Sequence, residues 1–269
     1  MSTYKIGFVG GGQMGGALLR GFIGTGLVDP ENVWVSEPDP ERLKRLVKDF
    51  GVRPAVSNRA AVESAEVVIL AVKPQQLLEV LGDLEPVLSA GKIVITIAAG
   101  MTTEKIESRV GRSLRLVRVM PNSPALVGSA ASVVSPGKGA DREAVEAALE
   151  LFGAVGEAIE LPEEYQNGVT AISGSGPAYF YLLVEALIDA AIELGIAPDI
   201  AERLVVQTAA GSADMLTETL KRPEELRRMV TSPGGTTEAA VGTFDDAGFR
   251  EIVRRAVDAA VRRAEELAK

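Results

Sequence analysis

A glycine-rich turn directly after the first strand-like run is the feature that most restricts how this chain can fold. The turn reads Gly10-Gly11-Gly12-Gln13-Met14-Gly15, between a β-prone run at residues 4–9 and a helix predicted over residues 13–24. In a βαβ dinucleotide-binding unit, Gly10 allows the tight turn, Gly12 lets the backbone approach a pyrophosphate, and Gly15 lets helix and strand pack closely. The amides near Gln13 and Met14 then face the phosphates from the positive end of the helix. The alternative is a glycine-rich turn that holds no ligand.

Strand-like and helix-like segments alternate through about residue 160. Further strands are predicted at residues 33–36, 67–72, 92–97, 114–120, 132–134 and 154–159, and further helices at residues 40–48, 75–88, 102–110 and 141–152. The run at residues 67–72 is apolar throughout, as is typical of a strand buried on both faces of a sheet. The alternation predicts an α/β fold with a Rossmann-type, doubly wound and largely parallel sheet.

The pattern changes at Leu161-Pro162, after which no strand is predicted. Helices are expected at residues 163–172, 178–194, 199–220, 236–244 and 249–268. We therefore expect two domains, residues 1–161 and residues 162–269, without a flexible linker between them.

The helix expected at residues 178–194 is apolar around most of its circumference. Its only charges are Glu185, Asp189 and Glu193, which follow one stripe of the helix. Such a helix must be covered by several neighbours. It is either the central helix of a small bundle or a helix covered by a partner subunit. The few helices that one chain offers favour the partner.

Composition excludes several classes of chemistry and partner. The 269 residues contain no Cys and no His, which removes thiolate nucleophiles, Ser-His-Asp triads and His-ligated zinc. No metal site is expected. The net charge of -9 argues against nucleic-acid binding. No signal peptide pattern and no uncharged apolar stretch of membrane-spanning length are found, so we expect a cytoplasmic protein without a membrane span.

Several small or polar residues follow the predicted parallel strands, at the sheet edge where ligands bind in open α/β folds. These residues are Ala71, Val72, Lys73 and Pro74 after one strand, Ala98, Ala99 and Gly100 after the next, and Asn122 after the third. Lys73 is then a cation at the mouth of the cofactor crevice, or else a surface lysine. The small side chains at residues 98–100 leave room for a nicotinamide ring.

Glu37 ends the second predicted strand, where an acidic side chain accepts hydrogen bonds from the adenosine ribose. Its carboxylate would repel a 2′-phosphate, although Arg42 nearby counters part of that charge. This favours NADH weakly over NADPH. The alternative is a solvated Glu-Pro-Asp-Pro turn.

A second anion site is predicted around Ser232-Pro233-Gly234-Gly235-Thr236-Thr237. With Ser232 as N-cap and Pro233 in the first helical position, the amides of Gly234, Gly235 and Thr236 would be free to hold a small carboxylate. Residues 173–177, Ser-Gly-Ser-Gly-Pro, similarly open the apolar helix. The alternative in both places is a structural helix cap.

In this order and spacing, the motifs resemble those of the pyrroline-5-carboxylate reductase family, from Ile6 to the last helix. The resemblance covers the glycine turn, Ala71 to Pro74, Ala98 to Gly100, Met120-Pro121-Asn122-Ser123-Pro124, and the segments at residues 173–179 and 232–237. It implies a Rossmann domain and a helical dimerisation domain that interlocks with its twin, with further assembly into decamers. The implied reaction is the reduction of L-1-pyrroline-5-carboxylate to L-proline with NADH or NADPH, the last step of proline biosynthesis.

The same resemblance implies roles for individual residues. Thr237 is the hydroxyl nearest the ring nitrogen, the carboxylate is held by Ser232, Gly235 and Thr236, Glu163 is a further substrate-side residue, and Asn58 contacts the cofactor. Two residues depart from the family pattern. Glu37 replaces a small or basic residue, which puts the phosphate preference in doubt, and Ser123 replaces a Thr without an expected effect on chemistry.

Two other functions compete with this interpretation. A 3-hydroxyacid or 6-phosphogluconate-type dehydrogenase would carry a lysine four residues beyond the glycine-rich helix start, and none follows residues 173–176. A nucleotide-sensing regulator would keep the glycine turn and Glu37 but would have no use for a second anion site.

Overall fold

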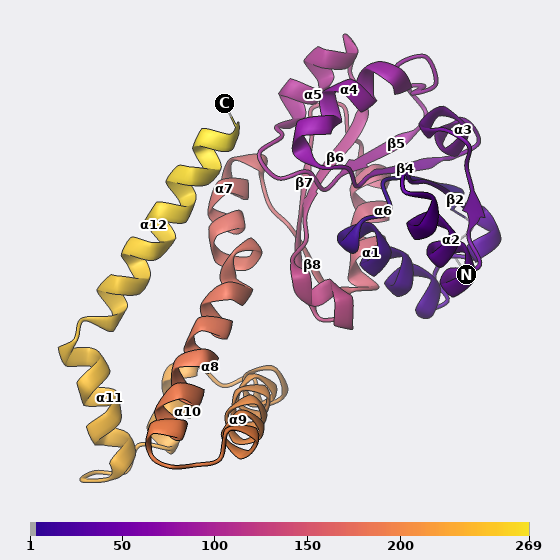
Figure 1. The fold of residues 1–269 in the computed structure, drawn as a ribbon. Coiled ribbons are helices and arrows are strands. Elements are labelled where there is room, and N and C mark those ends of the chain that lie inside the picture. The colour runs from indigo at the N-terminus through magenta and orange to yellow at the C-terminus, as the bar shows by residue number, and fades with distance from the viewer. Residues whose placement is uncertain (1–3, 269) are drawn as a thin grey trace. The chain divides into compact units, whose positions relative to one another are not determined.

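The computed structural model describes residues 4–268, with an eight-stranded sheet followed by helices (Figure 1). The strands are β1 (Ile6–Val9), β2 (Val33–Ser36), β3 (Arg53–Pro54), β4 (Val67–Leu70), β5 (Ile93–Thr96), β6 (Arg115–Met120), β7 (Ala130–Pro136) and β8 (Gly156–Glu160). Their order in the sheet is β3-β2-β1-β4-β5-β6-β7-β8. Neighbouring strands are parallel except β6 and β7. The first six strands thus have the 3-2-1-4-5-6 order of dinucleotide-binding folds, and the doubly wound prediction is confirmed.

Helices cover both faces of this sheet, and each face has its own apolar cluster. On one face, Phe22 of α1 (Gln13–Gly24) contacts both Phe8 of β1 and Phe152 of α6 (Arg142–Gly153), at ring-centroid distances of 6.0 Å. On the other face, α4 (Pro74–Leu84) and α5 (Thr103–Val110) bury Leu77, Leu81 and Ile106. This arrangement leaves the carboxyl ends of β1, β4 and β5 as the sheet edge that the loops cover.

Short elements were missed from the sequence. They are β3, α3 (Asn58–Glu63) and α10 (Pro223–Met229), each too short to show a clear period. The helix expected at residues 163–172 is irregular. It consists of a 3₁₀ turn (Glu163–Tyr165), one α-helical turn, α7 (Gln166–Val169), and a π-helical turn (Thr170–Gly174).

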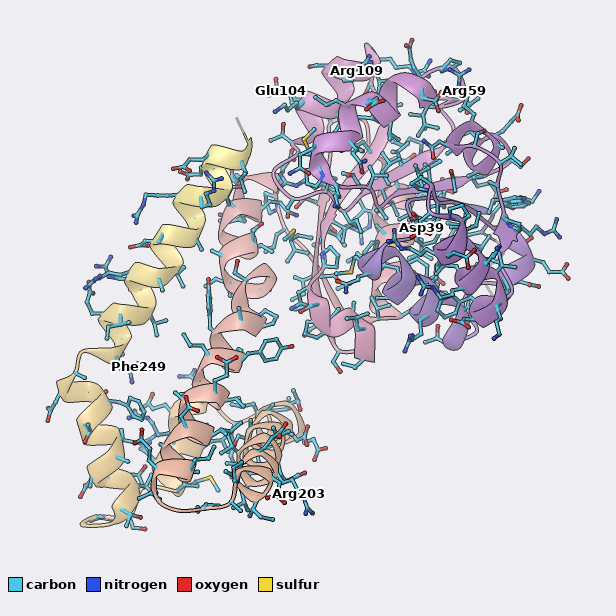
Figure 2. All side chains as sticks on the ribbon, in the orientation of Figure 1. Asp39, Arg59, Glu104, Arg109, Arg203 and Phe249 are labelled. Atoms are coloured by element: carbon cyan, nitrogen blue, oxygen red, sulfur yellow. The ribbon has the colours of Figure 1, made fainter. Side chains whose placement is uncertain are left out.

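The remaining helices are α2 (Pro40–Phe50), α8 (Gly176–Glu193), α9 (Pro198–Thr219), α11 (Thr236–Asp246) and α12 (Phe249–Ala268). The described residues form two compact units. The first contains the residues up to Ser175 and those from Ala260 onward, and the second is Gly176–Ala259. In the second unit, Phe244 and Phe249 pack edge to face at 5.5 Å where α11 meets α12 (Figure 2). No strand follows Glu160 among the described residues. A functional boundary at 161/162 stays a prediction.

Most side chains of α8 are exposed in the single chain. Only Gly176 is buried, while Phe180 is 71% exposed and Leu182 is 66% exposed. Helix α8 is therefore not the buried centre of a small bundle, and the first of the two alternatives for this helix is wrong. The segment Glu163–Glu193 is also long and apolar enough, by length and composition alone, to cross a membrane, which the sequence did not lead us to expect.

Candidate functional site

The glycine turn lies between β1 and α1, against the end of β4. Gly10 has φ +99°, and a Cβ atom there would lie 2.7 Å from the carbonyl oxygen of Ala71. A Cβ atom on Gly15 would lie 2.6 Å from the carbonyl oxygen of Gly10. These contacts explain why both positions are glycine. Gly12 is the N-cap of α1 and has no atom within 4 Å of where its Cβ would be, so its backbone is open to a ligand.

A cavity of about 680 Å³ begins at this turn and extends along the ends of β1, β2 and β4. Seven residues predicted to bind the cofactor line it: Gly10, Gly12, Glu37, Asn58, Ala71, Val72 and Lys73. The predicted residues that do not line it are Gln13, Met14, Gly15, Pro74, Ala98, Ala99, Gly100 and Asn122. Sequence reasoning missed Val56, which lines the cavity and is 98% exposed. Its only signal was an apolar residue in the polar stretch before Asn58.

Glu37 lies buried in the wall of this cavity, with 3% of its side chain exposed. Its Oε2 accepts a hydrogen bond from the Gly11 amide at 2.8 Å. Its Oε1 accepts from the Asp39 amide at 3.1 Å and from Arg42 at 3.0 Å. Asp39 is the N-cap of α2, where the hydrogen bond from the Arg42 amide lowers the pKa of its carboxyl below the ordinary value. Glu37 is therefore not a solvated turn residue.

Asn58 and Lys73 also line the cavity. The Oδ1 atom of Asn58 accepts a hydrogen bond from the Ser36 hydroxyl at 2.7 Å, which joins the start of α3 to the end of β2. Lys73 is the exposed N-cap residue of α4, directly after β4. Lys73 lines the cavity, and its role as a cation toward the cofactor stays a prediction.

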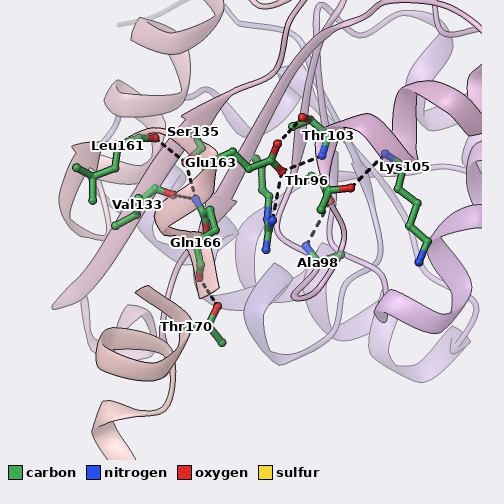
Figure 3. Close-up of polar contacts among 12 residues, drawn as sticks. Thr96, Ala98, Thr103, Lys105, Val133, Ser135, Leu161, Glu163, Gln166 and Thr170 are labelled. Atoms are coloured by element: carbon green, nitrogen blue, oxygen red, sulfur yellow. Dashed lines mark hydrogen bonds and ion pairs between the residues drawn. The ribbon is translucent and has the colours of Figure 1, made fainter. Parts of the chain in front are cut away.

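The segment of Ala98, Ala99 and Gly100 follows β5. Ala98 and Gly100 are buried and Ala99 is half-buried. The Ala98 amide donates to Thr96 Oγ1 at 3.3 Å, and Gly100 has φ +72°. Directly afterwards, Thr103 at the start of α5 bonds Glu163 (Figure 3). Thus Glu163, predicted to contact the substrate, contacts the first residue of the helix that follows the segment predicted to hold the nicotinamide.

Asn122 uses both ends of its side chain to join segments of the chain. Its amide nitrogen donates to the Ser173 carbonyl at 3.0 Å, and its Oδ1 accepts from the Ala131 amide at 2.9 Å. The residue is 8% exposed. The end of β6 is thereby tied to β7 and to the π-helical turn.

The segment from Ser232 to Thr237 differs from its predicted form. Helix α11 begins at Thr236 with Gly235 as N-cap, so the prediction of Ser232 as N-cap and Pro233 in the first helical turn is wrong. Instead, the Gly235 amide donates to the Ser232 carbonyl at 3.0 Å with Gly234 at φ +71°, as in a type II turn with Pro at its second position. The sequence could not reveal this because Ser-Pro opens both a helix and a turn.

Two of the three amides expected to be free are used within the chain. The Gly234 amide donates to Glu238 Oε2 at 2.7 Å, and the Gly235 amide closes the turn. The Thr236 amide has no such bond among residues 4–268. Thr236 is exposed and Thr237 is half-buried. Fewer donors than predicted are therefore available in the single chain for a carboxylate.

No group of three or more Asp and Glu residues among residues 4–268 is arranged to hold a metal ion. The polar groups that line the cavity include backbone amides, hydroxyls, the carboxylates of Glu37, Glu79 and Asp83, and the cations Arg42 and Lys73. These fit a phosphate-bearing dinucleotide, because the open amides at the helix start bind phosphate and the buried carboxylate accepts from hydroxyls.

Comparisons with known proteins cover the whole chain. A reductase named pyrroline-5-carboxylate reductase from Methanosarcina acetivorans is 43% identical over 269 residues, 100% of both chains. The reductase of that name from Pseudomonas aeruginosa is 41% identical, over 100% of this chain and 98% of the other. The chain belongs to the pyrroline-5-carboxylate reductase family.

Family profiles and solved structures agree with this membership. The profile described as pyrroline-5-carboxylate reductase dimerisation matches residues 163–267, and the one described as NADP oxidoreductase coenzyme F420-dependent matches residues 5–100. The structure of a pyrroline-5-carboxylate reductase from Coxiella burnetii matches with a TM-score of 0.95 at 40% identity, covering 100% of both chains. That of Plasmodium falciparum pyrroline carboxylate reductase, with NADP bound, matches with a TM-score of 0.89 at 31% identity and the same coverage. The chain thus carries the dimerisation domain of this reductase family.

Proposed function

We propose that this protein is a pyrroline-5-carboxylate reductase, an oxidoreductase that uses NADH or NADPH to reduce L-1-pyrroline-5-carboxylate to L-proline in the last step of proline biosynthesis. The observation that carries the proposal is the cavity at the ends of β1, β2 and β4, built around the glycine turn in a chain that matches such reductases over its full length. The cavity provides the phosphate-binding amides and the buried carboxylate that a nicotinamide dinucleotide requires.

The reaction requires little acid–base chemistry from the protein, which fits a chain without histidine. When bound, the nicotinamide supplies a hydride from its C4 to the carbon of the substrate C=N bond. The ring nitrogen of the substrate carries no hydrogen in the neutral imine, so it must gain one proton to become the secondary amine. The protein either binds the substrate already protonated, as the iminium, or donates the proton from the Thr237 hydroxyl, to which water then returns one. Positioning and electrostatics then carry most of the acceleration.

The cofactor-binding residues in this proposal lie at the ends of strands and at the starts of helices. They are Gly10, Gly12, Gln13, Met14, Gly15, Glu37, Asn58, Ala71, Val72, Lys73, Pro74, Ala98, Ala99, Gly100 and Asn122. NADH is weakly preferred, because the Glu37 carboxylate accepts from ribose hydroxyls and repels a 2′-phosphate.

The substrate residues share the turn before α11 and its first residues: Ser232, Gly235, Thr236 and Thr237, with Glu163 as a further candidate. Thr237 is the catalytic residue among them. The Thr236 amide offers one donor to the carboxylate. Because the Gly234 amide is held by Glu238, substrate binding gains further donors if Glu238 turns away.

The assembly in this proposal is a cytoplasmic homodimer through the helices of residues 162–269, with further association into decamers. The exposed apolar side chains of α8 support it, since Phe180 and Leu182 have no cover within one chain. The boundary at 161/162 then separates a dinucleotide-binding domain from a dimerisation and substrate domain. Nucleic acid and membrane have no part in this function.

The test is turnover with a defined product. Purified protein is mixed with NADH or NADPH, pyrroline-5-carboxylate is added, and loss of cofactor fluorescence is followed while proline is identified as the product. Consumption of cofactor only in the presence of this substrate supports the proposal. Cofactor binding without consumption indicates a sensor, and turnover of 3-hydroxyacids instead indicates the dehydrogenase alternative.

A further inference from the structure

The loop between β5 and α5 has one local contact and two neighbours from distant parts of the chain. At its start, the Ala98 amide donates to Thr96 Oγ1. In its middle, a Cβ atom on Gly100 would lie 3.0 Å from the carbonyl oxygen of Leu267, near the end of α12. At its end, Thr103 bonds Glu163, which lies 60 residues further along the chain. The loop is thus held by segments at both ends of the matched dimerisation region.

The Glu163 contact at the loop end is bidentate and charge-assisted. Oε1 of Glu163 accepts from the Thr103 amide at 2.8 Å, and Oε2 accepts from the Thr103 hydroxyl at 2.5 Å (Figure 3). The carboxylate therefore satisfies the first backbone donor of α5 at the positive end of that helix. Hydrogen bonds to an ionised acceptor are stronger than neutral ones, so this contact adds to the Thr102 side-chain cap in stabilising the start of α5.

Arg118 holds the same carboxylate from the sheet. Its guanidinium lies 3.2 Å from Glu163 Oε1, with 3% of the Arg118 side chain and 24% of the Glu163 side chain exposed. Arg118 pairs in register with Thr96 of β5, the residue that holds Ala98. One network therefore runs from β5 and β6 through Glu163 to Thr103, and it encloses the loop between them.

Both oxygens of Glu163 are engaged within the chain, which points to a role beyond the substrate contact considered above. We infer that Glu163 is a positioning residue: acting through Thr103, it fixes the loop of Ala98, Ala99 and Gly100 against which the nicotinamide ring packs. This inference rests on the proposed function, because it takes the loop as the nicotinamide site. It makes the first residue of the dimerisation region a support of the cofactor site.

The test compares two ligands that differ in the nicotinamide. ADP-ribose fills the adenosine and pyrophosphate sites but lacks the ring, whereas NADH fills all of them. Dissociation constants for both are measured without substrate, by titration calorimetry. The variants are Glu163→Gln and Thr103→Val, which keep the side-chain shapes, and Thr103→Ser, which keeps the hydroxyl. Glu164→Gln is the matched control, since Glu164 is exposed beside Glu163.

We expect Glu163→Gln and Thr103→Val to weaken NADH binding about 5- to 10-fold and to leave ADP-ribose binding unchanged, a loss in the range of one charge-assisted hydrogen bond. Thr103→Ser and the control should bind both ligands as the wild type does. The double variant should be no worse than the more severe single one, because both changes break one contact.

Three results would overturn the inference. If the variants weaken the binding of NADH and of ADP-ribose equally, the contact has a general structural role. An increase in KM for pyrroline-5-carboxylate without any change in NADH binding indicates a substrate ligand. If neither variant changes NADH binding, the contact between Glu163 and Thr103 has no role in the cofactor site. Since these titrations need no turnover, they remain informative when the proposed reductase activity fails, and that failure is read from the wild type alone.

Discussion

The carboxylate of Glu37 accepts a hydrogen bond from the backbone amide of Gly11, with 2.8 Å between Oε2 and the amide nitrogen. The bond joins the end of β2 to the glycine turn, 26 residues earlier in the chain. It places a buried negative charge beside the amides that would receive a pyrophosphate, with Arg42 as its only cationic partner among the described residues. We therefore expect cofactor choice to depend on how one carboxylate is shared between the turn, Arg42 and a ribose.

Replacing Glu37 with Ser should shift cofactor use toward NADPH. Two like charges about 4 Å apart repel by about 1–4 kcal/mol in water-like to surface-like surroundings, so the ratio of kcat/KM for NADH over NADPH should fall by about tenfold. Removal of the carboxylate also frees the Arg42 Nη1 atom to bind a 2′-phosphate, while its Nη2 atom stays beside Asp39. The measurement is kcat/KM for both cofactors in the wild type and in Glu37→Ser.

The matched control is Glu41→Gln, which removes an exposed carboxylate on the same helix as Arg42. Its ratio of kcat/KM for NADH over NADPH should equal that of the wild type. A wild type that prefers NADPH, or a ratio that Glu37→Ser leaves unchanged, would show that Glu37 serves only to hold the glycine turn.

The features predicted correctly from the sequence are those that local residues determine. The turn at Gly10 depends on its own backbone conformation and on the strand beside it, so spacing alone revealed it. The bidentate contact between Glu163 and Thr103 spans 60 residues and depends on the sheet register, which no local pattern contains. The turn at Ser232 was predicted wrongly because Ser-Pro opens both a helix and a turn, and the Gly234 amide was expected to be free because its acceptor, Glu238, lies outside the motif.

Removing the hydroxyl of Thr237 should slow the chemical step more than it weakens cofactor binding. In Thr237→Ala we expect kcat to fall by about tenfold if the hydroxyl only orients the ring nitrogen, and by about 10²-fold or more if it passes a proton. Thr237→Ser should restore most of the activity because it keeps the hydroxyl. The measurements are steady-state kcat and the dissociation constant for NADH.

Thr243→Ala provides the comparison, since Thr243 is an exposed threonine on the same helix whose hydroxyl bonds the Ala239 carbonyl. Its kcat should stay within about twofold of the wild type, as for surface substitutions generally. An unchanged kcat in Thr237→Ala would exclude this hydroxyl from the mechanism.

The apolar surface of α8 should be buried in a dimer. Light scattering at micromolar concentration should give a mass of at least two chains. Phe180→Glu should shift the protein toward monomer or reduce its solubility, because it places a charge where 71% of an aromatic side chain is exposed in the single chain. Leu126→Glu is the control, as Leu126 is 42% exposed in the sheet-containing unit. A monodisperse wild-type monomer would contradict the dimer.

The ion pair of Asp141 with Arg115 should make stability depend on pH in the acidic range. Asp141 is the N-cap of α6, and the hydrogen bond from Arg115 at 2.8 Å, followed by that from the Ala144 amide, lowers the pKa of its carboxyl below 3.8. A lowered pKa in the folded state means that the charged form stabilises the fold. That contribution is fully present above the unfolded pKa and is lost as the pH falls through the folded pKa.

Asp141→Asn keeps the cap but loses the charge, so the wild type should have the higher urea midpoint at pH 7. The difference between the two midpoints should shrink as the pH falls below 3.8. Glu104→Gln, at an exposed position in the first turn of α5, serves as control. A difference between wild type and Asp141→Asn that stays constant down to the lowest pH at which the protein is folded would show that the charge of Asp141 adds nothing to its cap.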